Sequence, residues 1–281
     1  MREQTSEKVG PTAWGIAYRR ANCDIPFAQD ILNELLVVMT PEEKTKMEAL
    51  VSEKNQALTP YFEARYKLLN HLVRETGIKQ IIELASGIAS RGIEMSEDPE
   101  IEYVEMDLPG IIGQKKEIID ALVEQSKIVL SGNLQLVSGS ALDDLSAASI
   151  HFDAHKPVVV IHEGLMRYLN FEQKAQVARH VKSLLEKFGG VYITPDITLA
   201  VRMDERMQNT VSTMVGMDIN ANAFENIEGA EKFFNDVGFT VEKHHFAEIR
   251  DELVSPRKLE LSEEEVQKAI GENVFFVMKL K

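Results

Sequence analysis

The sequence predicts an α/β fold built around a mostly parallel β-sheet, with all 281 residues in a single domain, 1–281. From residue 80 onwards, short apolar runs typical of buried strands alternate with helical stretches. Such alternation is typical of βαβ units, which place helices on both faces of a parallel sheet. Before residue 78 only helix signals occur, so a helical cap over 1–77 should precede the sheet.

The first helices of this cap carry recognisable boundaries. Helices are predicted over Pro11–Arg20, with Thr12 as a candidate N-cap, and over Pro26–Val38, where apolar residues recur at helical spacing. The stretch Thr40–Glu43 combines an N-cap, a proline at the first helical position and acids in the first turn. A further helix should therefore begin there.

Thr59 and Pro60 repeat this start signal before a helix over Tyr61–Glu75. Gly77 is expected to end that helix, because glycine readily takes the left-handed conformation that follows a last turn.

Seven strands are then expected, at Gln80–Leu84, Glu102–Met106, Leu134–Ser138, Val158–Ile161, Val191–Thr194, Thr240–Phe246 and Asn273–Leu280. The helices between them are predicted around Arg91–Met95, Ile111–Lys127 and Phe171–Phe188. The stretch 197–236 is long for a simple crossover, so we interpret it as a helical insertion over the carboxyl edge of the sheet. Four methionines in it, Met203, Met207, Met214 and Met217, could cover a small apolar substrate or simply pack.

Composition excludes several functional classes. The chain carries 45 acidic and 31 basic residues, a formal net charge of −14. This surplus of acid disfavours nucleic acid and membrane lipid as partners, because both require clustered Lys and Arg. The single cysteine, Cys23, allows no internal disulfide and no cysteine-based zinc site. With a polar N-terminus that lacks a signal sequence, these features predict a cytoplasmic protein without a metal site.

The loop after the first strand points to a nucleotide-like ligand. Gly87 stands where a ligand needs close approach of the backbone, but Ala85 replaces the first glycine of the dinucleotide pattern G-x-G-x-x-G. Asp107 ends the second strand about 20 residues later, where a carboxylate can accept both ribose hydroxyls. The alternative is that Asp107 is only a turn residue before Pro109.

Three segments together resemble class I S-adenosylmethionine-dependent methyltransferases: E-L-A-S-G-I-A-S-R-G from Glu83, Y-V-E-M-D-L-P from Tyr103 and I-H-E-G-L-M-R-Y-L from Ile161. Within that class the chain is similar to the leucine carboxyl methyltransferase family, which includes polyketide-type O-methyltransferases of the tetracenomycin-pathway kind. The resemblance spans roughly residues 10–280. It implies a Rossmann-like seven-stranded sheet whose last strand is antiparallel.

The resemblance also implies S-adenosyl-L-methionine as the cofactor. Gly87, with Glu83 nearby, would lie against its methionine moiety, and Asp107 would hold its ribose. Ser140 and Ala141 match the segment beside the adenine, where the family often carries Asp-Leu.

Asp143 or Asp144 would then supply the missing adenine contact. Glu163, after the fourth strand, matches a cofactor-contacting family glutamate. Arg65 matches an arginine that pairs with the cofactor carboxylate, although it could equally be a solvated helix residue. Either Arg19 or Arg20 matches another basic family position, and the sequence does not choose between them.

Methyl transfer from a sulfonium is an in-line displacement, for which the protein mainly supplies proximity and orientation. A carboxylate acceptor is ionised at neutral pH and needs no base, whereas a hydroxyl acceptor benefits from one. His162, beside Glu163, is the candidate catalytic base, and the alternative is a hydrogen-bonded structural histidine.

The expected function is therefore an O-methyltransferase whose acceptor is a small molecule, with a carboxylate of a polyketide-like metabolite as the leading candidate. A protein C-terminal leucine carboxyl methyltransferase is the first alternative. An NAD-dependent oxidoreductase and a non-catalytic binding module on the same fold are the others. The sequence leaves the oligomeric state open.

Overall fold

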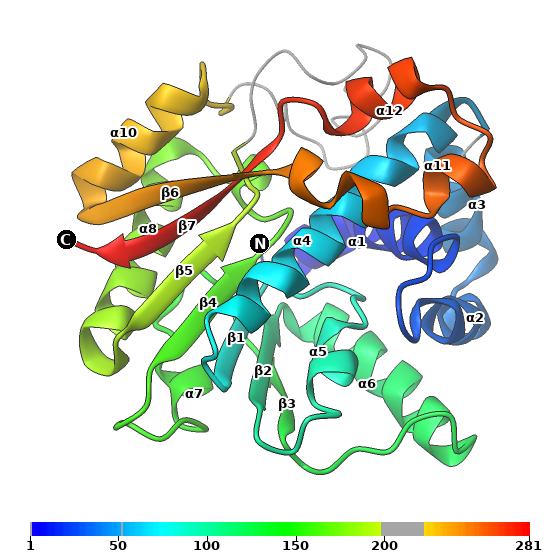
Figure 1. Ribbon diagram of the computed structural model, residues 1–281. Helices are drawn as coiled ribbons and strands as arrows, with labels where there is room; N and C mark the ends of the chain where they lie inside the picture. The colour runs from blue at the N-terminus through cyan, green and yellow to red at the C-terminus, as the bar shows by residue number, and fades with distance from the viewer. Residues whose placement is uncertain (1, 52, 198–221) are drawn as a thin grey trace.

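The computed structural model describes residues 2–51, 53–197 and 222–281 and has the predicted α/β architecture (Figure 1). Its central sheet has the strand order β3-β2-β1-β4-β5-β7-β6. Strand β7 runs antiparallel to both β5 and β6, and the other neighbouring strands are parallel. The antiparallel last strand is thus confirmed.

The strands begin and end within one residue of their expected positions. They are β1 (Gln80–Leu84), β2 (Glu102–Asp107), β3 (Leu134–Ser138), β4 (Val158–His162), β5 (Gly190–Thr194), β6 (Phe239–His245) and β7 (Val274–Leu280). All residues of β1 and β4 are buried. Helices on both faces of a parallel sheet require such strands, which is why these two lack an alternating polar pattern.

The described helices are α1 (Arg2–Ala21), α2 (Ala28–Val38), α3 (Pro41–Leu50), α4 (Thr59–Glu75), α5 (Arg91–Met95), α6 (Pro109–Glu124), α7 (Ser146–Ser149), α8 (Phe171–Phe188), α10 (Ile227–Val237), α11 (Ser255–Lys258) and α12 (Glu263–Ile270). Three short 3₁₀ helices, η1 (Glu53–Leu58), η2 (Met166–Tyr168) and η3 (Phe246–Glu252), complete the set. Among these helices, none is both long enough and apolar enough to cross a bilayer.

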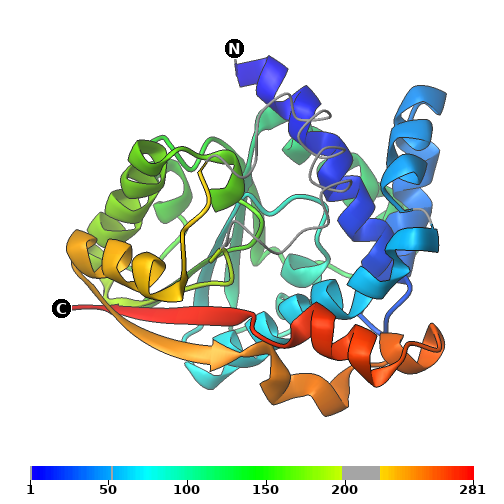
Figure 2. The ribbon, with the colours of Figure 1, turned by 90° about the horizontal axis from the view of Figure 1, so that it is seen from above.

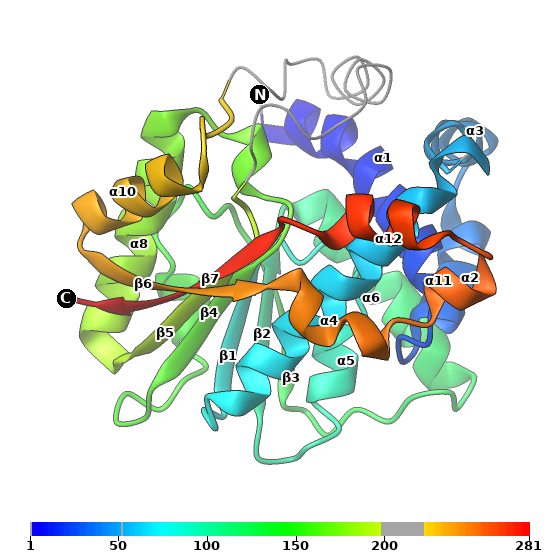
Figure 3. The same cartoon turned by 45° about the horizontal axis from the view of Figure 1, so that its top comes forward.

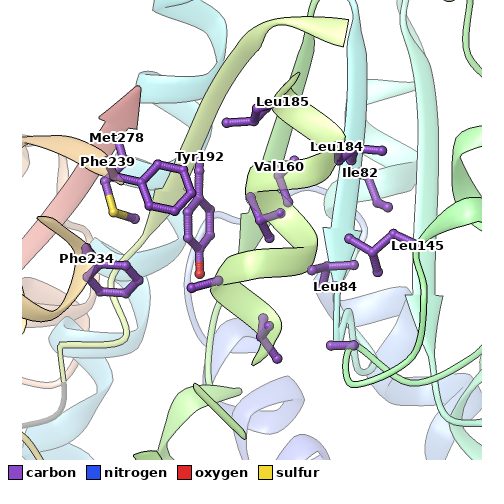
Figure 4. Close-up of a cluster of buried hydrophobic side chains, with 14 of the residues drawn as sticks. Ile82, Leu84, Leu145, Val160, Leu184, Leu185, Tyr192, Phe234, Phe239 and Met278 are labelled. Carbon is purple, nitrogen blue, oxygen red and sulfur yellow. The ribbon is translucent and has the colours of Figure 1, made fainter. Parts of the chain in front are cut away.

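Two apolar cores lie on the two faces of the sheet. On one face, alternate strand residues such as Ile82, Val160 and Tyr192 pack against α8 and α10 (Figure 4). On the other face, Ile81 and the intervening strand residues pack against α4, η3 and α12. Because successive side chains of a strand point to opposite faces of the sheet, each apolar strand contributes residues to both cores.

The N-terminal helices form a third group, which does not lie flat on the sheet. Helices α1 and α2 pack on α6, and α1 also packs on α3 and α4. This group lies on one side of the molecule, opposite α8 and α10 (Figure 2 and Figure 3). It places one face of α1 close to the loops that follow the central strands.

The helix boundaries were predicted with mixed success. Thr40 forms a capping box with Glu43, as expected. Thr12 does not cap a helix, because α1 already begins at Arg2 and continues through Pro11, and the Thr12 hydroxyl lies 2.9 Å from the hydroxyl of Tyr168 instead. Thr59 is likewise no N-cap, because η1 leads directly into α4.

Gly77 ends α4 as expected, with a φ of 65°. Of the insertion expected over 197–236, the structure describes Ile197, which is buried, and the part from residue 222 that includes α10. The four methionines assigned to it lie outside the described residues.

Two buried ion pairs join the sheet to the helices over it. Glu83 and Glu105 are directly opposite each other on β1 and β2, and both are almost fully buried. Arg91 of α5 contacts Glu83, and Lys115 of α6 contacts Glu105. Burial raises the pKa of Glu105 to about 7, against the opposing charge of Lys115. The two cations thus allow two neighbouring carboxylates to be buried side by side on the same face of the sheet.

Replacing Lys115 alone with Met would leave Glu105 buried without its partner. We expect this change to lower the free energy of unfolding by about 3–5 kcal/mol. The double variant Lys115→Met, Glu105→Leu removes both polar groups and should recover most of that loss. Urea denaturation measures both values, and a double variant as unstable as the single one would contradict the account.

Candidate functional site

A cavity of about 340 Å³ opens at the carboxyl ends of the central parallel strands. It lies where the strand order reverses between β1 and β4, the position at which open α/β sheets bind ligands. Four strand-end loops and one face of α1 enclose it. Its walls include Thr12, Ala13, Ile16, Arg20, Arg65, Gly87, Asp107, Ser140, Ala141, Glu163, Leu165 and Tyr168.

The loop after β1 brings backbone directly to the cavity wall. Gly87 and Ala85 both have positive φ, 57° and 53°. A Cβ atom on Gly87 would lie 3.6 Å from the Cβ of Ala13 on α1, so this helix packs closely over the loop. Ala85 adopts the left-handed backbone that a glycine would take more easily. The loop therefore has the backbone geometry of a glycine-rich turn, although only one of these two left-handed residues is a glycine.

Asp107 holds this loop in place. One of its carboxylate oxygens accepts a hydrogen bond of 2.7 Å from the N–H of Gly87, and the other accepts one of 2.7 Å from the N–H of Leu108. Burial raises the pKa of Asp107, and these two bonds oppose the shift. Because a carboxylate has about four acceptor positions, Asp107 can still accept hydrogen bonds from a ligand in the cavity.

Three arginines from three helices converge on Glu163, the first residue after β4. Arg20 of α1 contacts one carboxylate oxygen of Glu163. On the other oxygen, Arg91 of α5 lies at 3.2 Å and the Nε of Arg65 of α4 lies at 3.6 Å. All four side chains are almost completely buried. A single carboxylate thus joins α1, α4 and α5 to the end of β4.

The charges around Glu163 do not balance at the cavity wall. Glu83 compensates Arg91, so Arg20 and Arg65 are left to share Glu163. Burial, together with the charges of Arg91 and Arg65, lowers the pKa of Arg20 to about 9. Among the described residues, the Nε and one terminal nitrogen of Arg65 have no hydrogen-bond partner. A buried guanidinium without a full set of acceptors favours an anionic ligand.

Arg20 lines the cavity and Arg19 does not, which settles the choice that the sequence left open. Arg19 instead lies over the ring of Phe62, 5.6 Å from its centroid. Of the other predicted cofactor residues, the cavity brings together Arg65, Gly87, Asp107, Ser140, Ala141 and Glu163.

Glu83, expected near the methionine moiety of the cofactor, does not line the cavity. Its carboxylate is occupied by Arg91 and by the Tyr103 hydroxyl, which donates a hydrogen bond of 2.7 Å. Burial opposes the charge of Arg91, but Glu83 raises the pKa of this arginine above its usual value. Glu83 therefore fixes Arg91, which in turn contacts Glu163.

His162, the candidate catalytic base, does not line the cavity either. It is fully buried. Its Nδ1 lies 2.9 Å from a carboxylate oxygen of Asp196, and its Nε2 contacts the hydroxyl of Tyr192. With both ring nitrogens occupied and no exposure to the cavity, His162 cannot reach an acceptor proton in this arrangement.

The segment after β3 lines another wall through Ser140 and Ala141. The Ser140 hydroxyl accepts a hydrogen bond of 3.2 Å from the N–H of Leu142. Asp143 and Asp144, expected to supply an adenine contact, do not line the cavity, and Asp144 accepts a hydrogen bond from the N–H of Ser146. Backbone and small side chains therefore form this wall.

Sequence reasoning missed two contributors to the site. Arg91 lies in one of the three motifs, but nothing in the sequence indicates its burial, because arginine is rarely fully buried unless it is paired. Tyr168 lies in the motif after β4, and its hydroxyl, 2.9 Å from that of Thr12, links η2 to α1 across the cavity. Only the fold brings these distant residues together.

Comparison with known proteins gives a consistent result. The leucine carboxyl methyltransferase family matches residues 12–182, more than half of the chain. A protein of Mycobacteroides abscessus, described as a putative S-adenosyl-L-methionine-dependent methyltransferase, is 30% identical over 113 residues, 39% of this chain and 36% of that protein. A second protein of this organism with the same description is 27% identical over 195 residues, 64% of this chain and 60% of its own length.

A similarly described protein of Mycobacterium ulcerans is 24% identical over 149 residues, which is 52% of this chain and 46% of that protein. The chain thus matches between about a third and three fifths of the length of these curated relatives. Among solved structures, a DUF574 family protein of Streptomyces avermitilis superposes with a TM-score of 0.57 at 17% identity, over 87% of this chain and 92% of that one. This likeness shows the fold.

The left-handed residues of the loop after β1 allow a paired test. Gly87→Ala places a Cβ in left-handed backbone and should lower the free energy of unfolding by roughly 1–2 kcal/mol. Ala85→Gly removes such a cost but adds freedom to the unfolded chain, so the change should be less than about 1 kcal/mol. Thermal and urea denaturation measure both, and equal losses in the two variants would contradict the assigned conformations.

Proposed function

Because the chain belongs to the leucine carboxyl methyltransferase family, we propose that it binds S-adenosyl-L-methionine in this cavity and transfers the methyl group to an oxygen of a small acceptor. The observation that carries the proposal is the buried, incompletely paired guanidinium of Arg65 on the cavity wall. The cofactor has a carboxylate to offer this arginine and no phosphate, which fits a loop that has lost the extra glycines.

The residues present fit the parts of this cofactor. Arg65, together with Arg20, would hold the carboxylate of its methionine moiety, because both guanidiniums border the cavity and share only Glu163. Asp107 would accept hydrogen bonds from the ribose hydroxyls. Ser140 and Ala141 would lie beside the adenine, with contacts from backbone and apolar surface.

The bound cofactor supplies a methyl group made electrophilic by the positively charged sulfur. The protein's own contribution is then to orient the two reactants in line and to exclude water. One face of α1 closes the cavity through Thr12, Ala13 and Ile16, and the contacts of Arg20 with Glu163 hold this helix down. The same buried charges that bind the cofactor thus also close the site.

A carboxylate is the acceptor that these surroundings favour. Among the described residues that line the cavity, the ionisable side chains are Arg20, Arg65, Asp107, Glu163 and Tyr168, and none is a histidine. A carboxylate is ionised at neutral pH and attacks without a base, so it needs no histidine in the cavity wall. A polyketide-like carboxylic acid is therefore the preferred acceptor class, and a peptide C-terminus is the alternative that the family name raises.

Within this proposal, residues 1–281 act as one domain, with 1–77 as the cap; of the insertion expected over 197–236, the structure describes residues 197 and 222–236. The two other functions considered for the sequence make different predictions. An NAD-dependent oxidoreductase would bind a nicotinamide dinucleotide, and a non-catalytic module would bind no S-adenosylmethionine.

Calorimetric titration of Arg65→Met tests the role of this arginine. The variant should bind S-adenosylhomocysteine about ten- to a hundredfold more weakly than the original protein, because a charge-assisted hydrogen bond contributes about 1.5–3 kcal/mol. Methylthioadenosine, which lacks the amino-acid carboxylate, should bind both proteins equally. Equal weakening for both ligands would show that the substitution disturbs the cavity instead, and binding of NAD alone would contradict the proposed function.

Labelled methyl transfer to a panel of carboxylic acids, phenols and peptide C-termini tests the acceptor. We expect labelled product with small carboxylic acids, and release of labelled methanol on treatment with alkali, because esters are base-labile and ethers are not. Alkali-stable product would overturn the carboxylate assignment. Product with peptide C-termini alone would favour the protein substrate.

A further inference from the structure

A second buried cluster lies immediately behind the cavity and joins the ends of β4 and β5. It consists of His162 at the end of β4 with Tyr192, Thr194 and Asp196 at the end of β5. The described residues of this cluster are at least nine-tenths buried, and none lines the cavity. The proposed reaction therefore uses none of these polar groups directly.

Asp196 accepts hydrogen bonds from three consecutive backbone amides of the loop after β4. One carboxylate oxygen accepts from the N–H of Gly164 at 2.6 Å. The other accepts from the N–H groups of Leu165 at 2.7 Å and Met166 at 3.1 Å. These amides follow Glu163 directly, and Gly164 and Leu165 line the cavity. Asp196 thus fixes the backbone that presents the central carboxylate of the site.

His162 orients this carboxylate. The Tyr192 hydroxyl contacts Nε2 of His162. Burial raises the pKa of Tyr192 well above its usual value, so the phenol stays protonated and donates a hydrogen bond to Nε2. The proton of the neutral imidazole then resides on Nδ1, which donates to Asp196 at 2.9 Å. The hydroxyl of Thr194 accepts a hydrogen bond of 3.0 Å from the N–H of Asp196.

The turn that these bonds stabilise is conformationally demanding. Gly164 has a φ of 81°, and a Cβ on it would lie 3.8 Å from a terminal nitrogen of Arg65. The loop thus passes directly beside the guanidinium proposed to bind the cofactor. Despite burial, the hydrogen bonds from His162 and the Gly164 amide, together with the charge of Arg65, lower the pKa of Asp196 below its usual range. Asp196 is therefore a carboxylate across the ordinary pH range.

We infer that Asp196, oriented by His162, is a positioning residue that sets the cofactor site through the three amides of Gly164–Met166. The inference rests on the proposed function for its ligand, S-adenosylhomocysteine, but its structural part can be measured without any ligand. In this inference His162 orients Asp196 and does not act as a catalytic base.

The test compares Asp196→Asn with the original protein. An asparagine has only one acceptor oxygen, so its side-chain NH2 group would face backbone N–H donors of the Gly164–Met166 loop. Calorimetry should show S-adenosylhomocysteine binding weakened about tenfold or more, with the fraction of binding-competent protein unchanged. A lower competent fraction at unchanged affinity would mean a merely structural role and would overturn the inference.

Two substitutions of His162 separate positioning from catalysis. His162→Asn can still donate to Asp196 through its side-chain amide, so affinity and turnover should stay close to those of the original protein. His162→Leu cannot donate and should weaken binding as Asp196→Asn does. Loss of turnover in both variants at unchanged affinity would overturn the inference in favour of a catalytic histidine.

Hydrogen exchange gives a ligand-free measurement. The amides of Gly164, Leu165 and Met166 should exchange faster in Asp196→Asn than in the original protein. Unchanged exchange would overturn the inference whether or not the cofactor binds. If the original protein binds no S-adenosylhomocysteine but exchange responds as expected, the proposed function fails and the role of Asp196 in fixing the loop stands.

Discussion

The ion pairs of Glu163 are the interaction on which the rest of the site depends. Glu163 leaves the end of β4, and its carboxylate meets Arg20 of α1, Arg65 of α4 and Arg91 of α5. Together with the Thr12–Tyr168 hydroxyl pair, this contact holds α1 over the strand ends, since this helix otherwise packs mainly on other helices. The carboxylate of Glu163 therefore contributes to closing the sheet edge into a cavity.

Such a cluster is expensive as a stabilising device, because burying charges costs more free energy than their attraction usually returns. The cost is understandable if the charges serve a ligand. Glu83 neutralises Arg91, whereas Arg20 and Arg65 keep unsatisfied capacity at the cavity wall. A ligand carboxylate would complete their coordination, so folding and binding would use the same buried cations.

Sequence patterns predicted the sheet well because strand signals are local. Gly87 and Asp107 were also found from the sequence, since their spacing reflects the ends of two adjacent strands. Buried polar networks were not predictable in this way. Neither the pairing of Glu83 with Arg91 nor that of His162 with Asp196 follows from sequence spacing. Each pair joins residues of two different elements, which only the folded structure brings together.

The central claim is that Arg20 and Arg65 hold the carboxylate of S-adenosylmethionine while Asp107 holds its ribose. A crystal structure of the chain with S-adenosylhomocysteine tests it most directly. The account predicts the amino-acid carboxylate within hydrogen-bond distance of Arg65 and both ribose hydroxyls on Asp107. A ligand bound outside this cavity, or bound in it with the adenine against the arginines, would contradict the account.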